Sequence, residues 1–227
     1  MTVRPLPATR LALAAGLLCA AGAARGQNLI SDPHFASGIS AWSLRLSGGI
    51  TATLVRDSGP GADGSPGFAA LAGASFNPVT LFARTCVPVQ PGVVYSFGGS
   101  VRFRTSQQSQ ASFTLNFYPD AACGTAILSP PPPPSSTAAS GGTPGAWTLC
   151  AGSGAAAPPG AASAALELNL SGVSPGGTPS VDFDDVYVGR AGTVEPPAAV
   201  PSLSRAGVLA LGLALALAGT LAARSAR

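Results

Sequence analysis

The sequence is poor in the residues that carry most enzyme chemistry. Its 227 residues include no lysine, one histidine and only 9% charged residues. A Ser-His-Asp triad would depend on His34 alone, and the spacing of the cysteines fits no zinc pattern, with no spare histidine to complete one. His34 stands beside Pro33 and is expected at the surface or at a strand edge. The composition therefore argues against an enzyme, which needs convergent acids, bases or nucleophiles.

The net charge of +3 comes from the two ends of the chain. Six of the twelve arginines lie there: Arg4, Arg10, Arg25, Arg205, Arg224 and Arg227. Between residues 27 and 199, six arginines stand against nine acidic residues, a net charge of −3. Because this part has no basic cluster, nucleic acid is not an expected partner.

Residues 1–26 have the pattern of a secretory signal peptide. Arg4 and Arg10 precede an apolar run from Leu11 to Ala21, and small residues follow it. Cleavage after Gly26 is favoured because a strand-like pattern begins at Asn28; cleavage after Ala23 is the alternative. The start of the chain therefore predicts export.

A second apolar run, from Ala206 to Ala223, is interrupted only by Thr220. As a helix it covers roughly 27 Å, close to the roughly 30 Å hydrocarbon core of a bilayer. Arg224 and Arg227 follow it, which favours a cytoplasmic C-terminus by the positive-inside rule. The pattern predicts a transmembrane helix at 206–223 with the preceding chain outside.

The segment before this helix resembles the IPTL-type C-terminal sorting signal, I-P-T-L-S-x-W-G. The matching positions are Val200, Pro201, Ser202, Leu203, Ser204 and Gly207, while Ala206 replaces the usual tryptophan. Bacteria with outer membranes present this signal, residues 200–227 here, to an exosortase-like transpeptidase. The resemblance implies cleavage near Pro201, starting from the inner membrane, and release or attachment at the cell surface or in the extracellular matrix. A plain membrane anchor is the alternative.

Residues 27–190 are predicted to form one all-β domain, followed by a linker at 191–199. Apolar and polar residues alternate strictly in 93–103, 113–117 and 164–170, as in half-buried antiparallel strands. Weaker candidates are 42–46, 50–56, 68–71, 79–89, 125–128, 147–150 and 181–188. About ten short strands predict a two-sheet antiparallel sandwich. The proline run 130–134 is expected to begin an exposed loop that reaches residue 145.

The opening Asn28–Phe35, with Gly38 and Trp42, resembles the start of carbohydrate-binding modules with a jelly-roll, galactose-binding-like fold. Residues 86–95 are similar to the middle hairpin of that fold and residues 181–188 to its closing strand, so the resemblance covers nearly all of 28–188. It implies a jelly roll that binds sugar without catalysis. Such modules often hold a structural calcium between the first and last strands, which implies a calcium ligand at Asp185. Ala36 stands where the family's glutamate ligand would be.

Asp184 and Asp185 are neighbours in the predicted last strand. Consecutive strand residues point to opposite faces, so we expect these side chains to diverge and not to flank one glycosidic bond. One solvated aspartate and one that braces a loop is the favoured interpretation. The alternative is the calcium site, which needs several oxygen ligands.

Three cysteines remain after removal of the signal peptide, and export allows them to form a disulfide. Residues 117–124 resemble a segment that accompanies a cysteine at the strand matching Cys86 in exported proteins of this kind. This resemblance implies a Cys86–Cys123 disulfide. A Cys123–Cys150 disulfide is the alternative.

The polar positions of the predicted strands suggest a ligand-binding face. Most aromatic residues have the parity of the core, with Phe82 and Tyr118 as exceptions. The candidate ligand face consists of Arg102, Asn116, Tyr118, Glu167 and Asn169. We expect an exported, surface-directed, non-catalytic sandwich that adheres to or builds extracellular polysaccharide. The alternative is a structural matrix protein that has no sugar ligand.

Overall fold

The computed structural model describes residues 27–45, 51–74, 80–105, 109–129, 132–140, 144–171 and 178–194. These residues belong to a compact unit that extends to Pro197 and is separate from residues 198–227. Within them no helix is long and apolar enough to cross a membrane. The predicted signal peptide (1–26), sorting motif (200–207) and transmembrane helix (206–223) lie outside the described residues.

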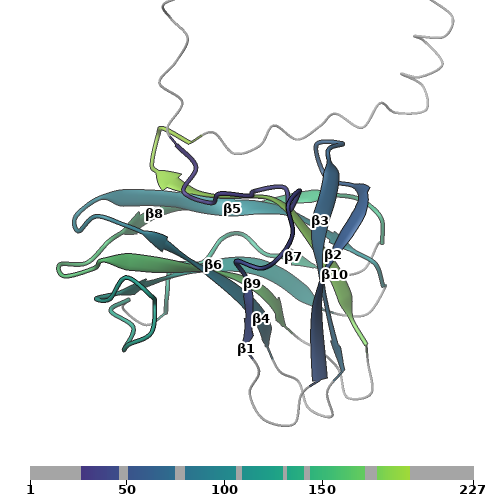
Figure 1. Ribbon diagram of the computed structural model, residues 1–227, viewed down its shortest axis with the longest axis horizontal. Helices are drawn as coiled ribbons and strands as arrows, with labels where there is room; N and C mark the ends of the chain where they lie inside the picture. Colours follow the sequence, from purple (N-terminus) through teal and green to yellow (C-terminus); the bar gives the residue numbers. More distant parts are fainter. Residues whose placement is uncertain are drawn as a thin grey trace, which may run out of the picture. The chain divides into compact units, whose positions relative to one another are not determined.

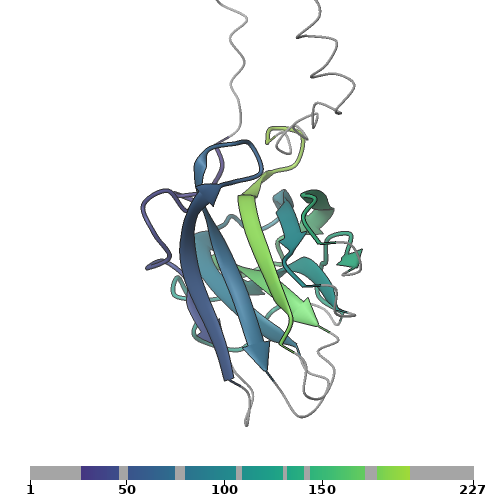
Figure 2. The same cartoon turned by 90° about the vertical axis from the view of Figure 1, so that its right-hand side faces the viewer.

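Two five-stranded antiparallel sheets face each other, as predicted (Figure 1). Sheet A has the order β1 (Ser43–Arg45), β4 (Leu81–Pro88), β9 (Ser163–Ser171), β6 (Gln110–Tyr118), β7 (Ala139–Ser140). Sheet B has the order β2 (Thr51–Pro60), β3 (Pro66–Ala74), β10 (Ser180–Arg190), β5 (Val94–Phe103), β8 (Thr148–Ala156). Figure 2 shows β2, β3 and β10 side by side in sheet B.

The core lies between the sheets and contains the residues that the alternation assigned to it. Tyr95, Phe97, Phe103, Phe113 and Phe117 are all at most 5% exposed. Phe113 of β6 meets Phe183 of β10 with ring centroids 5.6 Å apart, which joins sheet A to sheet B. Each buried side chain of this size stabilises the fold by about 1.5–3 kcal/mol.

The strand predicted at 125–128 is absent, and the exposed loop predicted after the proline run is only partly confirmed. Residues 125–128 form no strand, because Asp120 holds residues 122–125 in a turn, and Leu128 alone donates a backbone hydrogen bond to Phe117. The segment after the proline run is not fully exposed: it lies along the edge of β6 and contains β7. Pro134 lacks an N–H but still accepts from the Leu115 N–H through its carbonyl, so proline is tolerated at this edge.

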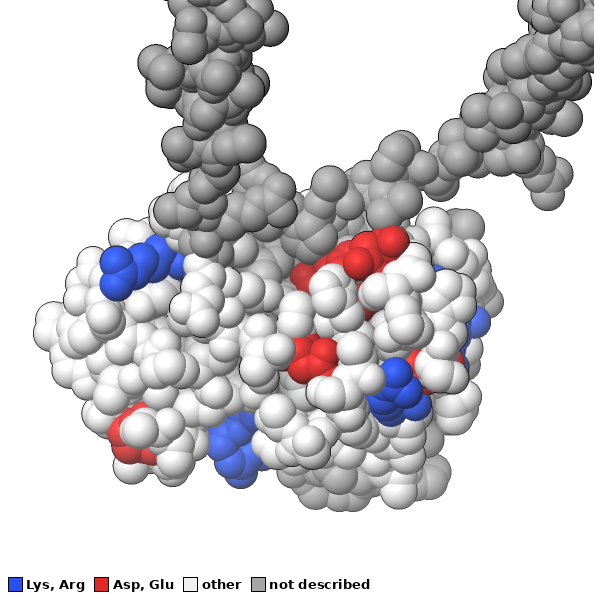
Figure 3. Space-filling model, turned by 45° about the horizontal axis from the view of Figure 1, so that its top comes forward, with Lys and Arg blue, Asp and Glu red and all other residues white. Residues whose placement is uncertain are grey.

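Charged side chains are sparse on the face seen in Figure 3, where uncharged residues make up most of the described surface. A network of arginine–aspartate ion pairs lies on the outer face of sheet B. There Asp182 contacts both Arg102, at 2.8 Å, and Arg104, which also contacts Asp57 at 2.7 Å. Asp182 has a fully buried side chain.

Candidate functional site

Four of the five predicted ligand residues come together on the outer face of sheet A. Asn116 and Tyr118 lie on β6, and Glu167 and Asn169 lie on the neighbouring β9. Arg84 of β4 lies opposite Glu167 in the antiparallel pairing of β4 with β9, so its side chain belongs to the same face. We call Arg84, Asn116, Tyr118, Glu167 and Asn169 the polar face.

Hydrogen bonds order the polar face. Arg84 donates to the Tyr118 hydroxyl at 3.1 Å, and its guanidinium lies 5.8 Å from the centre of that ring. Asn169 donates to the Thr114 hydroxyl at 2.8 Å. Burial raises the pKa of Glu167, while a hydrogen bond from Asn116 and the charge of Arg84 act in the opposite direction.

The polar face has an inner and an outer layer. Asn116, Tyr118 and Asn169 are 5%, 2% and 8% exposed, so their polar atoms mainly support their neighbours. Arg84 and Glu167 are partly exposed. Phe82, which pairs with Asn169 on the same face, is also partly exposed. A ligand would therefore contact Phe82, Arg84 and Glu167.

A disulfide holds a loop against one end of this face. Cys86 of β4 is bonded to Cys123, so the predicted pairing is confirmed, and Cys150 remains a buried free thiol. Cys123 packs with Tyr118 and Ala165, two residues on the outer side of sheet A. Residues 119–125 therefore form a fixed wall beside the polar face.

Asp120 shapes this wall and gives it a pH dependence. Its carboxylate accepts from the N–H groups of Ala122, Gly124 and Thr125, and hydrogen bonds led by the Thr125 hydroxyl hold the pKa of Asp120 well below its usual range. A lowered pKa in the folded state adds stability above the unfolded pKa, about 4, which is lost as the pH falls.

We therefore expect Asp120→Asn to lower the free energy of unfolding at pH 6. The NH₂ group of asparagine cannot accept the hydrogen bonds that the backbone N–H groups now donate to the carboxylate. The difference from the unsubstituted protein should narrow as the pH falls from 4 toward 2. Urea unfolding at pH 6, 4 and 2.5 measures it. A difference that stays constant over this range contradicts the assignment.

Arg102 is not part of the polar face. It lies on β5 in sheet B, where it contacts Asp182 and where its guanidinium lies 4.8 Å from the ring centre of Phe68 and 4.4 Å from that of Trp147. Arg84 was missed in its place. Arg84 lies two residues after Phe82, so strand alternation places both side chains on the same face of β4. This alternation could have identified Arg84 from the sequence.

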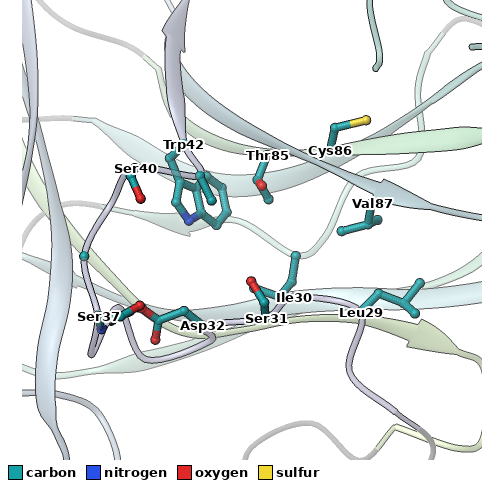
Figure 4. A pocket seen from close by; sticks show the side chains of 12 residues that line it. Leu29, Ile30, Ser31, Asp32, Ser37, Ser40, Trp42, Thr85, Cys86 and Val87 are labelled. Carbon is teal, nitrogen blue, oxygen red and sulfur yellow. Dashed lines mark hydrogen bonds between the residues drawn. The ribbon is translucent and has the colours of Figure 1, made fainter. Parts of the chain in front are cut away.

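A hollow of about 230 Å³ lies between the opening segment and the free part of the β4 edge (Figure 4). Asp32 and Ser37 line one side, with Trp42 and Thr85 across from them. Both oxygens of Asp32 already accept hydrogen bonds from residues 36 and 37. The Asp32 carboxylate is therefore engaged within the opening segment and is less available to a ligand in the hollow.

The two adjacent aspartates of β10 do not diverge, so that prediction was wrong. Asp185 has a φ of 51°, and the register with β5 shifts between Asp184 and Tyr187. This β-bulge inserts one residue, after which Val186 and not Asp185 faces the core. Both carboxylates therefore lie on the outer side of sheet B, yet they are 0% and 4% exposed.

His34 of the opening segment and Asp63 of the turn between β2 and β3 complete a group that we call the His–Asp cluster. The His34 Nδ1 atom lies 2.8 Å from Asp185, 3.7 Å from Asp63 and 3.9 Å from Asp184. Burial raises the pKa of Asp184 to about 6 and also raises that of Asp185. The His34 side chain is 37% exposed, in keeping with the expected surface position. Its Nδ1 atom also contacts a buried carboxylate, which was not expected.

The calcium implied by the family resemblance does not fit this set of ligands. Calcium takes six to eight oxygen ligands, whereas here an imidazole nitrogen lies closest to the Asp185 carboxylate. Ala36 supplies no carboxylate in the position of the family's glutamate.

The fold is that of a carbohydrate-binding-module-like jelly-roll β-sandwich. A solved structure of carbohydrate-binding modules from the β-sandwich superfamily matches with a TM-score of 0.51 and 14% identity, over 73% of this chain and 63% of that one. The enzymatically active domain of tailspike protein 4 of bacteriophage CBA120 matches with a TM-score of 0.50 and 16% identity, over 72% of this chain and 21% of that one.

This chain thus covers less than two thirds of either structure. No protein-family model and no curated protein matches the sequence. At these identities the similarity concerns the fold alone.

Proposed function

We propose that this protein is an exported, non-catalytic β-sandwich that binds extracellular polysaccharide through the outer face of sheet A. The observation that carries the proposal is the polar face itself. Five polar side chains from three adjacent strands meet there, beside a loop that a disulfide holds in place. The similarity to carbohydrate-binding modules supports the same function.

The chemistry of this face suits a sugar chain. Sugar hydroxyls both donate and accept hydrogen bonds, and the face presents a donor, Arg84, beside an acceptor, Glu167. The partly exposed ring of Phe82 offers an apolar surface for the C–H groups of a pyranose. Tyr118 holds Arg84 and Asn116 holds Glu167, so binding needs little reordering of these side chains.

Substitution of the contacting residues tests the proposal. We expect Arg84→Ala and Glu167→Ala each to weaken retention on the bound polysaccharide about tenfold to a hundredfold, because each removes hydrogen bonds to a charged group. Arg190→Ala is a charge-matched control at the far end of β10, where Arg190 contacts Gln90. Glycan arrays and affinity electrophoresis with the full chain supply the measurements.

The alternative, a structural matrix protein without a sugar ligand, predicts no retention on any glycan. Retention that Arg84→Ala and Glu167→Ala leave unchanged would instead place the ligand elsewhere, for example in the hollow beside Trp42. Thr85→Val, which alters the hollow and spares the polar face, distinguishes this outcome.

We also propose that residues 1–26 direct export and that the C-terminal signal is cut near Pro201 by an exosortase-like transpeptidase. The intact mass of the mature protein tests both steps. We expect a chain that starts near Gln27 and ends near Pro201 in cells that have the transpeptidase, and a chain with the complete tail in cells that lack it. A surface protein that retains Arg227 in both strains favours the plain membrane anchor.

A further inference from the structure

The His–Asp cluster has the spacing of a metal site for a smaller ion than calcium. Each of its four residues offers one ligand atom, and these atoms all lie within 4.8 Å of one another. Ligand atoms around a tetrahedral zinc, at about 2.1 Å from the metal, are about 3.4 Å apart. The His34 distances of 2.8, 3.7 and 3.9 Å lie on both sides of this value. Small movements of the side chains would admit an ion.

Two buried oxygens in the cluster have no well-formed hydrogen bond. They are Oδ1 of Asp184 and Oδ1 of Asp185, on side chains 0% and 3% exposed, and the second contacts the imidazole Nδ1 of His34 at 2.8 Å. Buried polar atoms in folded proteins nearly always have a partner, so such a pair needs an explanation. Both oxygens point toward His34 Nδ1, and a cation among them would satisfy all three atoms.

The backbone is built to hold this arrangement. The bulge at Asp185 turns two consecutive carboxylates to one side of β10. The Ala62 N–H binds Oδ2 of Asp184 at 2.6 Å, which leaves Oδ1 directed into the cluster. Gly61 makes room for this contact, because a Cβ there would lie 2.1 Å from the same Oδ2 atom. The Val186 N–H binds the carbonyl of Pro33, which fixes the residue before His34.

We propose that the His–Asp cluster binds one divalent transition-metal ion of the zinc class through Nδ1 of His34 and the carboxylates of Asp63, Asp184 and Asp185. Imidazole nitrogen with carboxylate oxygen suits zinc and its neighbours, whereas calcium and magnesium prefer oxygen alone. His34 and Asp63 are 37% and 38% exposed, which gives the ion a path from solvent. The ion joins the opening segment to the β2–β3 turn and the last strand.

A protonated His34 is the competing explanation, since a positive imidazolium would also compensate the carboxylates. The two explanations differ in what happens when metal is added. Because His34 is the chain's only histidine, its imidazole gives a single, unambiguous NMR signal in protein prepared without a histidine tag. Zinc should shift or broaden this signal at a ratio of one ion per chain, while calcium at a hundredfold excess should neither shift it nor displace zinc.

Calorimetric titration of the full-length, chelator-treated protein with zinc measures the affinity. We expect His34→Gln and Asp184→Asn each to weaken zinc binding by more than about 100-fold, beyond the loss typical of groups that only support a ligand. Asp57→Asn, which removes a carboxylate outside the cluster, should leave binding unchanged. Cobalt bound to the unsubstituted protein should give visible d–d absorption bands, a readout that depends on no variant.

Three results would overturn the proposal: no binding of zinc or cobalt to the unsubstituted protein, displacement of either ion by calcium, or unchanged affinity in a folded His34→Gln variant. The polysaccharide assay is independent of this test, because the polar face lies on sheet A and the His–Asp cluster lies on the outer side of sheet B.

Discussion

Replacement of both bridged cysteines, Cys86→Ala with Cys123→Ala, is expected to lower the free energy of unfolding by about 4 kcal/mol. The two cysteines are 37 residues apart, and closing a loop of this length reduces the entropy of the unfolded chain by about that amount. The loop between them contains β5 and β6, one strand from each sheet, so its closure constrains both layers. Urea unfolding at neutral pH measures the change.

The same change is expected to weaken polysaccharide binding, because the wall beside the polar face loses its covalent link to β4. A reductant should lower the stability of the unsubstituted protein toward that of the double variant and leave the double variant unchanged. Cys150→Ala is the control, since it removes the buried free thiol and retains the disulfide. A loss smaller than about 1 kcal/mol would show that local contacts hold the wall without the disulfide.

Four of the five residues of the polar face could be assigned to an outer face from the sequence, because the alternation of apolar and polar residues can be judged within each strand separately. Period-two patterns in residues 113–117 and 164–170 assigned Asn116, Glu167 and Asn169 to an outer face, and β6 and β9 are neighbours in sheet A. Alternation does not tell which sheet a strand joins. Arg102 has the correct parity on β5, but β5 belongs to sheet B, so this residue was grouped with the wrong partners.

The His–Asp cluster was beyond sequence reasoning for a different reason. Strict alternation places Asp184 and Asp185 on opposite faces, and one residue with positive φ cancels that rule. Aspartate adopts this conformation more readily than most residues, but nothing in the sequence marks Asp185 in preference to Asp184. The turn that carries Asp63 is closed by local hydrogen bonds, but its position beside β10 depends on the pairing of β3 with β10, which alternation does not reveal. Sequence periodicity describes regular strands, and this cluster depends on an irregular one.

Asp182→Ala is expected to lower the free energy of unfolding by about 3 kcal/mol. Its buried carboxylate accepts hydrogen bonds from Arg102 and Arg104, and its removal leaves two guanidinium groups close together without a counter-charge. Loss of one partner of a buried ion pair costs about 3–5 kcal/mol, and the lower end applies because the arginines are 22% and 38% exposed. Asp57→Ala, which removes an exposed partner of Arg104, should cost less than about 1 kcal/mol.

A replacement of the whole network separates the loss of a partner from the net contribution of the ion pairs. Burial raises the pKa of Asp182 although both arginines oppose the shift, so for this carboxylate desolvation outweighs the attraction between the charges. The more exposed Arg104 shows the opposite balance, because Asp57 and Asp182 raise its pKa in spite of burial. We therefore expect Asp182→Leu combined with Arg102→Met and Arg104→Met to recover most of the stability that Asp182→Ala loses, as apolar replacements of buried ion pairs do elsewhere. Urea unfolding of the triple and single variants makes the comparison. A triple variant as unstable as Asp182→Ala would mean that the ion pairs themselves stabilise sheet B.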